Sequence, residues 1–216
     1  MVRKEGRIHE AMHSTIPLVS FLVPSRGRFG QLIGSLASIK LTSPADARIE
    51  YLVRLDSDDS KSVHYARDLE TLFGARVIIG PPNAPIAHAH GLRREISPLY
   101  NELSNLATAP WVWIWNDDAW LRGNGWYQQL EKLPVEPSLV LVESLQHHQS
   151  YYHQHAANVL PMFLRNAWEK LGMPVAPEPI DLCMVDSIRA AGWPEHHLIG
   201  TCVVHDWRSN GGGLAE

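Results

Sequence analysis

The chain has 216 residues, of which 45% are hydrophobic, and its formal net charge is −4. A chain of this length and apolar content can bury the core of a single domain. The acidic balance gives no sign of the global positive field that nucleic-acid and anionic-membrane binders usually carry, although a local basic groove stays open.

Strands and helices are predicted to alternate from Ile16 to Trp115. Short apolar runs rich in Val, Ile and Trp predict buried strands, and apolar residues that repeat every three or four positions predict helices. Gly74 is expected to close the second helix. The predicted strands are 16–24, 49–56, 75–82 and 111–115, and the predicted helices are 27–40, 60–74 and 96–107.

The second half is less regular but continues the alternation. A strand is predicted at 138–144, a strand and a helix over 160–172, a helix over 179–193, and a last strand over 197–207. Alternation of this kind predicts an α/β fold with a doubly wound, mostly parallel central sheet that is flanked by helices.

One domain is expected over 16–207, with a polar leader before it (1–15) and a flexible tail after it (208–216). No stretch approaches the roughly 20 apolar residues that a transmembrane helix requires, and the first apolar stretch lacks a cleavage pattern. We therefore expect neither a membrane span nor an export signal. Cys183 and Cys202 lie in apolar surroundings without paired spacing, which predicts reduced core thiols and a cytoplasmic location.

Polar side chains follow three of the predicted strands where each strand ends. The first ends in 24–28 (PSRGR), the second in Asp56, and the fourth in Asn116, Asp117 and Asp118. In a doubly wound sheet these ends meet at one edge, which would gather two arginines and at least three carboxylates. Arginines pair with phosphate oxygens, and carboxylates hold Mg²⁺ or Mn²⁺. The set therefore predicts a site for a phosphate-bearing ligand with a divalent metal.

Five stretches of the chain form an ordered set of motifs. They are 19–39 (VSFLVPSRGRFGQLIGSLASI), 50–62 (EYLVRLDSDDSKS), 99–121 (LYNELSNLATAPWVWIWNDDAWL), 161–172 (PMFLRNAWEKLG) and 179–193 (PIDLCMVDSIRAAGW). In this order the stretches resemble the GT-A-fold glycosyltransferases and are most similar to the large family 2 group. The order of the five stretches, rather than any one of them, makes the resemblance specific. It extends over 16–207 and implies a GT-A fold.

The family's D-x-D metal motif falls here on Asn116, Asp117 and Asp118. The asparagine is a departure, because its neutral oxygen is the weaker ligand. The resemblance therefore implies Asp118 as the first metal ligand and Asp117 as the second. It also implies His205, in the last strand, as a ligand of Mn²⁺ or Mg²⁺, and Asp181 as the base of an inverting reaction.

The resemblance also places the nucleotide of a donor against the first strand end, the second strand end and the metal motif. Two adjacent arginines before the third predicted helix would add a contact to the diphosphate. The expected donor-binding residues are Pro24, Ser25, Arg26, Asp56, Arg93, Arg94, Asn116 and Asp117.

The implied activity is that of a metal-dependent glycosyltransferase of the hexosyltransferase type. A sugar would move from a nucleotide diphosphate sugar, with UDP-sugar favoured, to an acceptor hydroxyl. A carboxylate would take the proton of that hydroxyl, and the metal would offset the charge on the departing diphosphate. Residues 146–158, rich in His, Tyr and Gln, lie where such enzymes bind their acceptor. A saccharide, a lipid-linked glycan, a protein and a modified nucleic acid all stay open as acceptors.

Several of these residues also have a simpler structural interpretation. Asp117 and Asp118 could cap a turn before the next helix, and Asp181 could be an N-cap. Asp58 and Asp59 are better explained as helix caps. The arginines of the first turn could be solvated surface charges, and the three tryptophans of the fourth strand are expected in the core.

Two other classes of function stay open. A metal-dependent nucleotidyltransferase or hydrolase could use the same acidic cluster and would cleave or transfer the nucleotide phosphate. A non-catalytic GT-A-like module would bind a nucleotide sugar without turnover, and the asparagine in the metal motif keeps this alternative open. Further histidines lack the spacing of a metal centre and are expected at the surface: His88, His90, His147, His148, His153 and His155.

Overall fold

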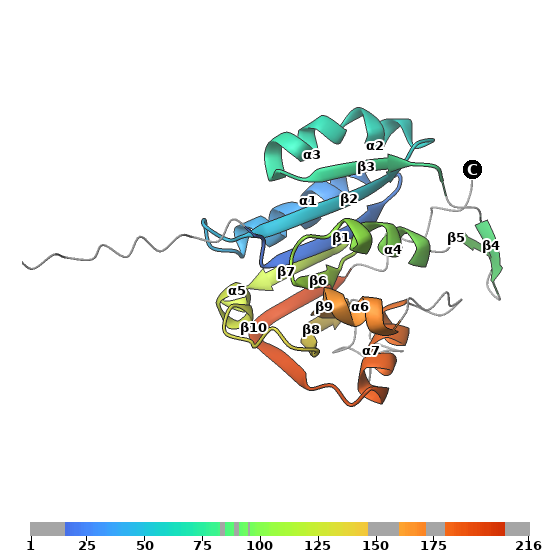
Figure 1. Ribbon diagram of the computed structural model, residues 1–216. Coiled ribbons are helices and arrows are strands. Elements are labelled where there is room, and N and C mark those ends of the chain that lie inside the picture. The colour runs from blue at the N-terminus through green and yellow to red at the C-terminus, as the bar shows by residue number, and fades with distance from the viewer. Residues whose placement is uncertain are drawn as a thin grey trace, which may run out of the picture.

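The structure is a computed structural model that describes residues 16–82, 85–88, 91–94, 96–146, 160–171 and 180–205. Strands and helices alternate along it, and the predicted elements are all present. In chain order they are β1 (Val19–Ser25), α1 (Phe29–Leu41), β2 (Ile49–Asp56), α2 (Ser60–His64), α3 (Ala66–Phe73), β3 (Arg76–Gly80), β4 (Pro85–His88), β5 (Gly91–Arg94), α4 (Ser97–Leu106), β6 (Trp111–Ile114), β7 (Ala119–Gly123), α5 (Trp126–Leu130), β8 (Leu139–Gln146), β9 (Met162–Leu164), α6 (Arg165–Leu171), α7 (Ile180–Ala190) and β10 (Glu195–His205) (Figure 1).

Eight strands form one sheet in the order β3-β2-β1-β6-β9-β8-β10-β7. The pairs β1–β2, β1–β6, β2–β3 and β8–β10 are parallel, whereas β6–β9, β8–β9 and β7–β10 are antiparallel. The mostly parallel α/β sheet is therefore confirmed, and Figure 1 shows α4 and α6 on its near face with α1 behind it. Because β1, β2, β3, β6, β8 and β10 run in one direction, their carboxyl ends share one edge of the sheet.

The core is built around β1, all of whose residues are buried. The ring of Phe21 packs against Trp113, Trp115 and Trp126, with centroid distances of 4.8, 5.4 and 5.9 Å. Trp111, Trp113 and Trp115 are all fully buried, as predicted for core residues. Truncation of a buried ring of this size to alanine costs about 3–5 kcal/mol, so these contacts fix β6 firmly beside β1.

Helix α1 holds the segment that follows β6. The Trp115 indole donates a hydrogen bond to Ser35 Oγ (2.7 Å), and the Ser35 hydroxyl donates one to the Asn116 carbonyl (3.2 Å). One turn further along α1, Ser38 Oγ accepts a hydrogen bond from the Leu121 amide (2.9 Å). The backbone on both sides of the acidic pair is therefore anchored to one helix.

The structure departs from the predicted elements in a few places. The helix expected over 60–74 is divided at Tyr65 into α2 and α3, and the Tyr65 ring stacks on Phe29 of α1 with a centroid distance of 4.4 Å. Gly74 closes α3 with a φ of +64°, as predicted. The strands β4, β5 and β7 and the helix α5 were not predicted.

The sequence predicts that both cysteines are core thiols. The prediction of core cysteines is wrong, because Cys183 and Cys202 are only partly buried. Cys202 alternates with the buried Thr201 and Val203 in β10 and therefore projects from the less covered face of the strand.

None of the helices in the described ranges is long and apolar enough to span a bilayer. The leader, the tail and the histidines at 147–155 lie outside the described residues.

A close backbone contact between β7 and β10 yields the first prediction. Gly123 has a φ of +87°, and a Cβ at this position would overlap the carbonyl oxygen of Gly200. Gly74 has a similar φ of +64° but no atom within 4 Å of its Cβ position, so it is a matched control. Gly123→Ala should lower the free energy of unfolding by about 3 kcal/mol, since backbone strain and overpacking add. Gly74→Ala should lower it by about 1 kcal/mol, from strain alone.

Urea denaturation followed by circular dichroism measures both variants. Equal losses of stability for the two glycines would contradict the close approach of β7 and β10.

Candidate functional site

Four strands bring their polar ends to one edge of the sheet. Ser25 ends β1, Asp56 ends β2, the segment 116–118 follows β6, and His205 ends β10. β1 lies between β2 and β6, so the chain leaves β1 toward one side and later returns on the other. Doubly wound sheets bind their ligands at such a switch point, outside the carboxyl ends of the strands. The strand ends that the sequence predicts to meet do lie together.

The acidic pair after β6 is deeply buried and is held by the β1–α1 turn. Asp117 and Asp118 are 0% and 1% exposed. Arg28 contacts both, with Nη2 2.5 Å from Asp117 Oδ1 and Nη1 2.8 Å from Asp118 Oδ2. The Ser25 hydroxyl donates a hydrogen bond of 2.6 Å to Asp117 Oδ2. Neither carboxylate caps a helix, and Arg28 is an ion-pair partner rather than a solvated surface charge.

His205, at the end of β10, contacts one of these carboxylates and the neighbouring asparagine. Its Nε2 lies 2.9 Å from Asp118 Oδ1 and 3.1 Å from Asn116 Nδ2. The β-sheet register explains this meeting, because His205 pairs with Ala119, the residue that follows Asp118. Two of the metal ligands that the sequence suggests, Asp118 and His205, are therefore direct neighbours although they lie 87 positions apart in the chain.

Asn116 is oriented by α4. The Tyr100 hydroxyl lies 2.9 Å from Asn116 Oδ1 and 3.1 Å from the Trp115 carbonyl oxygen, and its single proton serves one of them at a time. The amide nitrogen of Asn116 then faces His205. In this orientation the only side-chain oxygen of Asn116 is directed to Tyr100, which leaves Asp118 and His205 as the candidate metal ligands.

The other arginine of the turn binds the β2 end. Arg26 Nη1 donates a hydrogen bond of 2.8 Å to Asp56 Oδ2, and its guanidinium also pairs with Asp58. The Gly27 amide donates to Asp59 Oδ2 (2.7 Å), and Asp59 is the N-cap of α2, as predicted for that residue. Asp58, by contrast, is a partner of Arg26 and not a cap. The hydrogen bond to Asp58, followed by that to Asp56, raises the pKa of Arg26, so its charge is permanent.

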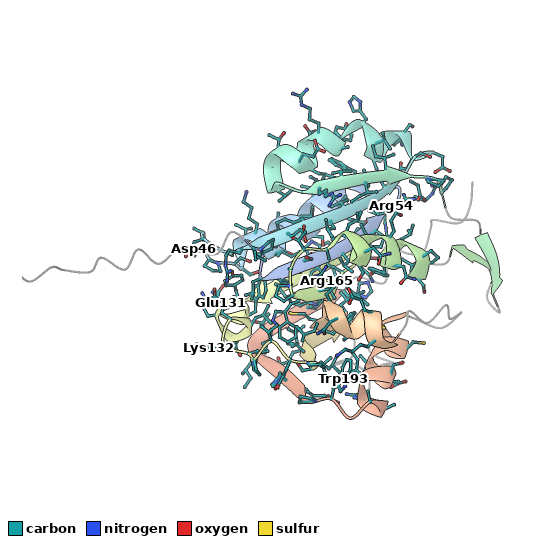
Figure 2. The ribbon with its side chains drawn as sticks, in the orientation of Figure 1. Asp46, Arg54, Glu131, Lys132, Arg165 and Trp193 are labelled. Carbon is teal, nitrogen blue, oxygen red and sulfur yellow. The ribbon has the colours of Figure 1, made fainter. Side chains whose placement is uncertain are left out.

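Asp56 is held in place by a second arginine. Arg54, which is labelled in Figure 2, lies on β2. It is only 2% exposed, and its Nη1 lies 3.2 Å from Asp56 Oδ1. The same guanidinium donates to Glu102 Oε2 (2.8 Å) and to the Pro81 carbonyl (2.7 Å). Its partners on β2, α4 and the segment after β3 fix Arg54, and Arg54 in turn fixes the Asp56 carboxylate.

The two neighbouring carboxylates differ in their acidity. Burial raises the pKa of Asp117 to about 6, although Arg28 and the Ser25 hydrogen bond oppose the change. Burial also acts to raise the pKa of Asp118, but its hydrogen bond with His205 and the charges of His205 and Arg28 outweigh it, so the pKa is lowered. Asp118 is therefore ionised at neutral pH, which a metal ligand requires.

Asp118 and His205 fit a divalent metal when the ligand supplies the rest of its shell. Within the described ranges, no three His, Cys, Asp or Glu side chains are grouped so that they could hold a metal by themselves. Mg²⁺ is typically bound by one or two carboxylates together with substrate phosphates and water. Two ligands at a right angle, each about 2.1 Å from such a metal, lie about 3.0 Å apart. The 2.9 Å between Asp118 Oδ1 and His205 Nε2 suits that arrangement as well as a hydrogen bond.

The remaining expected residues are placed only in part. Pro24 is buried in β1, where it pairs in register with Arg54. Arg93 and Arg94 lie in β5, a strand rather than the expected loop, and their side chains lie outside the described residues. Asp181 lies in the first turn of α7 and not before it, and its side chain is likewise outside.

Sequence reasoning missed the central role of Arg28, the clamp of Asp56 by Arg54, and the contact of Tyr100 with Asn116. Arg28 carried a usable signal, because it follows Ser25 by three positions in the turn after the first strand. Arg54 and Tyr100 carried none, since each meets its partners only through the packing of β2 and α4.

The sequence matches no protein-family model and shows no significant match to a curated protein. The fold, however, is shared with solved structures. Mannosyltransferase PcManGT from Pyrobaculum calidifontis, in complex with GDP-Man and Mn²⁺, matches 88% of this chain with a TM-score of 0.66 and 16% identity. Residues 1–349 of S. aureus TarS, in complex with UDP, match 88% with a TM-score of 0.63 and 9% identity.

The chain spans 57% of the PcManGT chain and 60% of the TarS chain. These similarities confirm the expected fold: the chain is folded like the GT-A glycosyltransferases.

The raised pKa of Asp117 predicts a pH-dependent stability in the metal-free protein. Between about pH 4 and pH 6 the folded protein retains a proton on Asp117 that the unfolded chain, with an ordinary value of 3.8, releases. The free energy of unfolding of the parent, relative to Asp117→Asn, should therefore fall by about 3 kcal/mol as the pH rises through this window, and be constant above it.

Chemical denaturation of both proteins across this pH range is the measurement. Subtraction of the Asn variant removes the contribution of the other titrating groups. A difference that is independent of pH, or that increases with pH, would contradict the buried state of Asp117.

Proposed function

We propose that the chain is a metal-dependent glycosyltransferase that uses a nucleotide diphosphate sugar as its donor. The observation that carries the proposal is the direct contact of Asp118 with His205, beside the arginine-bearing turn at the switch point of a GT-A-like sheet. The pair supplies hard oxygen and imidazole ligands, and the turn supplies cations for phosphate. PcManGT and TarS, which share the fold, hold GDP-Man with Mn²⁺ and UDP respectively, and this supports a nucleotide at the same edge.

In this proposal the donor lies along the carboxyl ends of β1, β2 and β6. The nucleoside faces Asp56, which Arg54 holds, and the end of β1 with its following turn (Pro24, Ser25 and Arg26). The diphosphate lies toward the amino end of α1, where backbone amides and the helix dipole favour negative charge. Arg93 and Arg94 are proposed as further diphosphate contacts from β5. UDP remains the favoured nucleotide, and GDP is the alternative that PcManGT suggests.

We assign a separate role to each residue of the segment 116–118. Asp118 and His205 would hold Mn²⁺ or Mg²⁺, which when bound offsets the charge of the departing diphosphate. Asp117 would position Ser25 and Arg28 rather than ligate the metal, because its two oxygens already face these partners. Asn116 would orient His205 from its own contact with Tyr100. Asp181, in α7, is the proposed base that takes the proton from the acceptor hydroxyl in an inverting transfer.

The decisive test is donor binding with and without Mn²⁺. Isothermal titration with UDP-glucose, UDP-N-acetylglucosamine and GDP-mannose should show binding that Mn²⁺ strengthens. Asp118→Ala should weaken the Mn²⁺-dependent binding at least about tenfold, because one of two protein ligands is lost. Asp186→Ala is the matched control, since this aspartate is exposed on α7 and should change affinity less than twofold.

Equal binding by the parent and Asp118→Ala would contradict the metal role. Analysis of the products then separates the classes of activity. Transfer or release of the sugar with an intact nucleoside diphosphate supports the glycosyltransferase. Cleavage within the diphosphate would indicate a nucleotidyltransferase or hydrolase, and binding without any product would indicate a non-catalytic module.

A further inference from the structure

Arg28 occupies an unusual position in the site. It bridges two adjacent carboxylates, Asp117 and Asp118, through its two terminal nitrogens. The carboxylates are buried, whereas the Arg28 side chain is 32% exposed. A buried pair of like charges requires a nearby cation, and Arg28 supplies it in the metal-free protein. Arg28 therefore lies between the buried carboxylates and the solvent.

A divalent metal on Asp118 would compete with that arginine. The guanidinium contacts Asp118 Oδ2, and His205 contacts Oδ1 of the same carboxylate. A metal held by this carboxylate would therefore place two positive charges within a few ångströms of the guanidinium, and like charges at such a separation repel strongly in a buried site. Both cations can use Asp118, but each weakens the binding of the other.

An anion at the amino end of α1 would resolve this competition. Arg28 immediately precedes α1, a helix of 13 residues whose described first turn carries no acidic side chain. A diphosphate at that helix end would meet Arg28 without a large backbone movement, and guanidinium groups bind phosphate oxygens in a bidentate manner. Arg28 would then exchange a carboxylate for a phosphate while the metal takes its place.

We propose that Arg28 is an exchangeable counter-ion that holds Asp118 in the metal-free protein and moves to the donor diphosphate when the metal binds. The proposal rests on the metal site of the proposed function and adds a residue and a sequence of events to it. This exchange makes the metal and the nucleotide bind cooperatively. The metal releases Arg28 from Asp118 so that it can bind the diphosphate, and the diphosphate holds Arg28 away from the metal site. Metal alone binds weakly, and metal with a nucleoside diphosphate binds tightly.

The test measures Mn²⁺ affinity without any donor. Electron paramagnetic resonance of free Mn²⁺ gives the dissociation constant of the parent, Arg28→Gln and Arg26→Gln at one fixed pH. Arg28→Gln should bind Mn²⁺ about tenfold more tightly than the parent, a change typical of coupled sites. Arg26→Gln should change the affinity less than twofold, because Arg26 contacts Asp56 and Asp58 instead. Saturating UDP or GDP should tighten Mn²⁺ binding to the parent more than to Arg28→Gln.

A second measurement uses the parent alone, in case Arg28→Gln does not fold. A Mg²⁺ titration followed by the Nε–Hε resonances of the arginine side chains should shift the Arg28 signal and leave that of Arg26 in place. Equal Mn²⁺ affinities of the parent and Arg28→Gln, or an Arg28 signal unaffected by Mg²⁺, would overturn the exchange. If UDP or GDP still binds in that case, the donor site stands; if neither nucleotide binds, the proposed function fails as well.

Discussion

Adjacent carboxylates repel each other, and at the end of β6 two of them are buried together. Asp117 and Asp118 can occupy this place only because groups from other elements offset their charge: Arg28, the Ser25 hydroxyl and His205. Removal of one partner from a buried ionic group typically costs about 3–5 kcal/mol, so the local fold depends on these contacts. The same contacts connect β1, β6 and β10 at the edge where a ligand of this fold binds.

The sheet explains how these groups come together. β1 and β6 are parallel neighbours, which places the turn after β1 beside the segment after β6. The antiparallel pairing of β7 with β10 then places His205 beside Ala119, and so beside Asp118. Helix α1 fixes the backbone of this segment through Ser35 and Ser38. Because each contact joins elements that are far apart in sequence, the site can form only when β1, β6, β7 and β10 are in place.

Local patterns were enough to predict the parallel half of the molecule. The strand expected at 49–56 coincides with β2, and the apolar run from 111 coincides with β6, where burial on both faces leaves an unbroken apolar run in the sequence. The polar strand ends at Ser25, Asp56 and Asp118 could likewise be located, since a doubly wound sheet gathers them at one edge.

What the sequence could not reveal depends on distant partners. β7 is a strand because β10 pairs with it, and its five residues, AWLRG, have no strand signature of their own. The break at Tyr65 accompanies its stacking on Phe29 of another helix. The ion-pair partners of the two arginines also come from distant parts of the sequence. Arg26 pairs with Asp56, whereas Arg28 pairs with Asp117 and Asp118. Arginines two positions apart carry no signal for this division.

A crystal structure of the protein with Mn²⁺ and UDP, or with Mn²⁺ and GDP, would locate both the metal and the diphosphate. We expect an anomalous Mn²⁺ peak within coordination distance of Asp118 and His205, and a diphosphate that joins this metal to the amino end of α1. A metal bound away from Asp118, or a nucleotide bound elsewhere than the shared edge of β1, β2 and β6, would contradict this expectation.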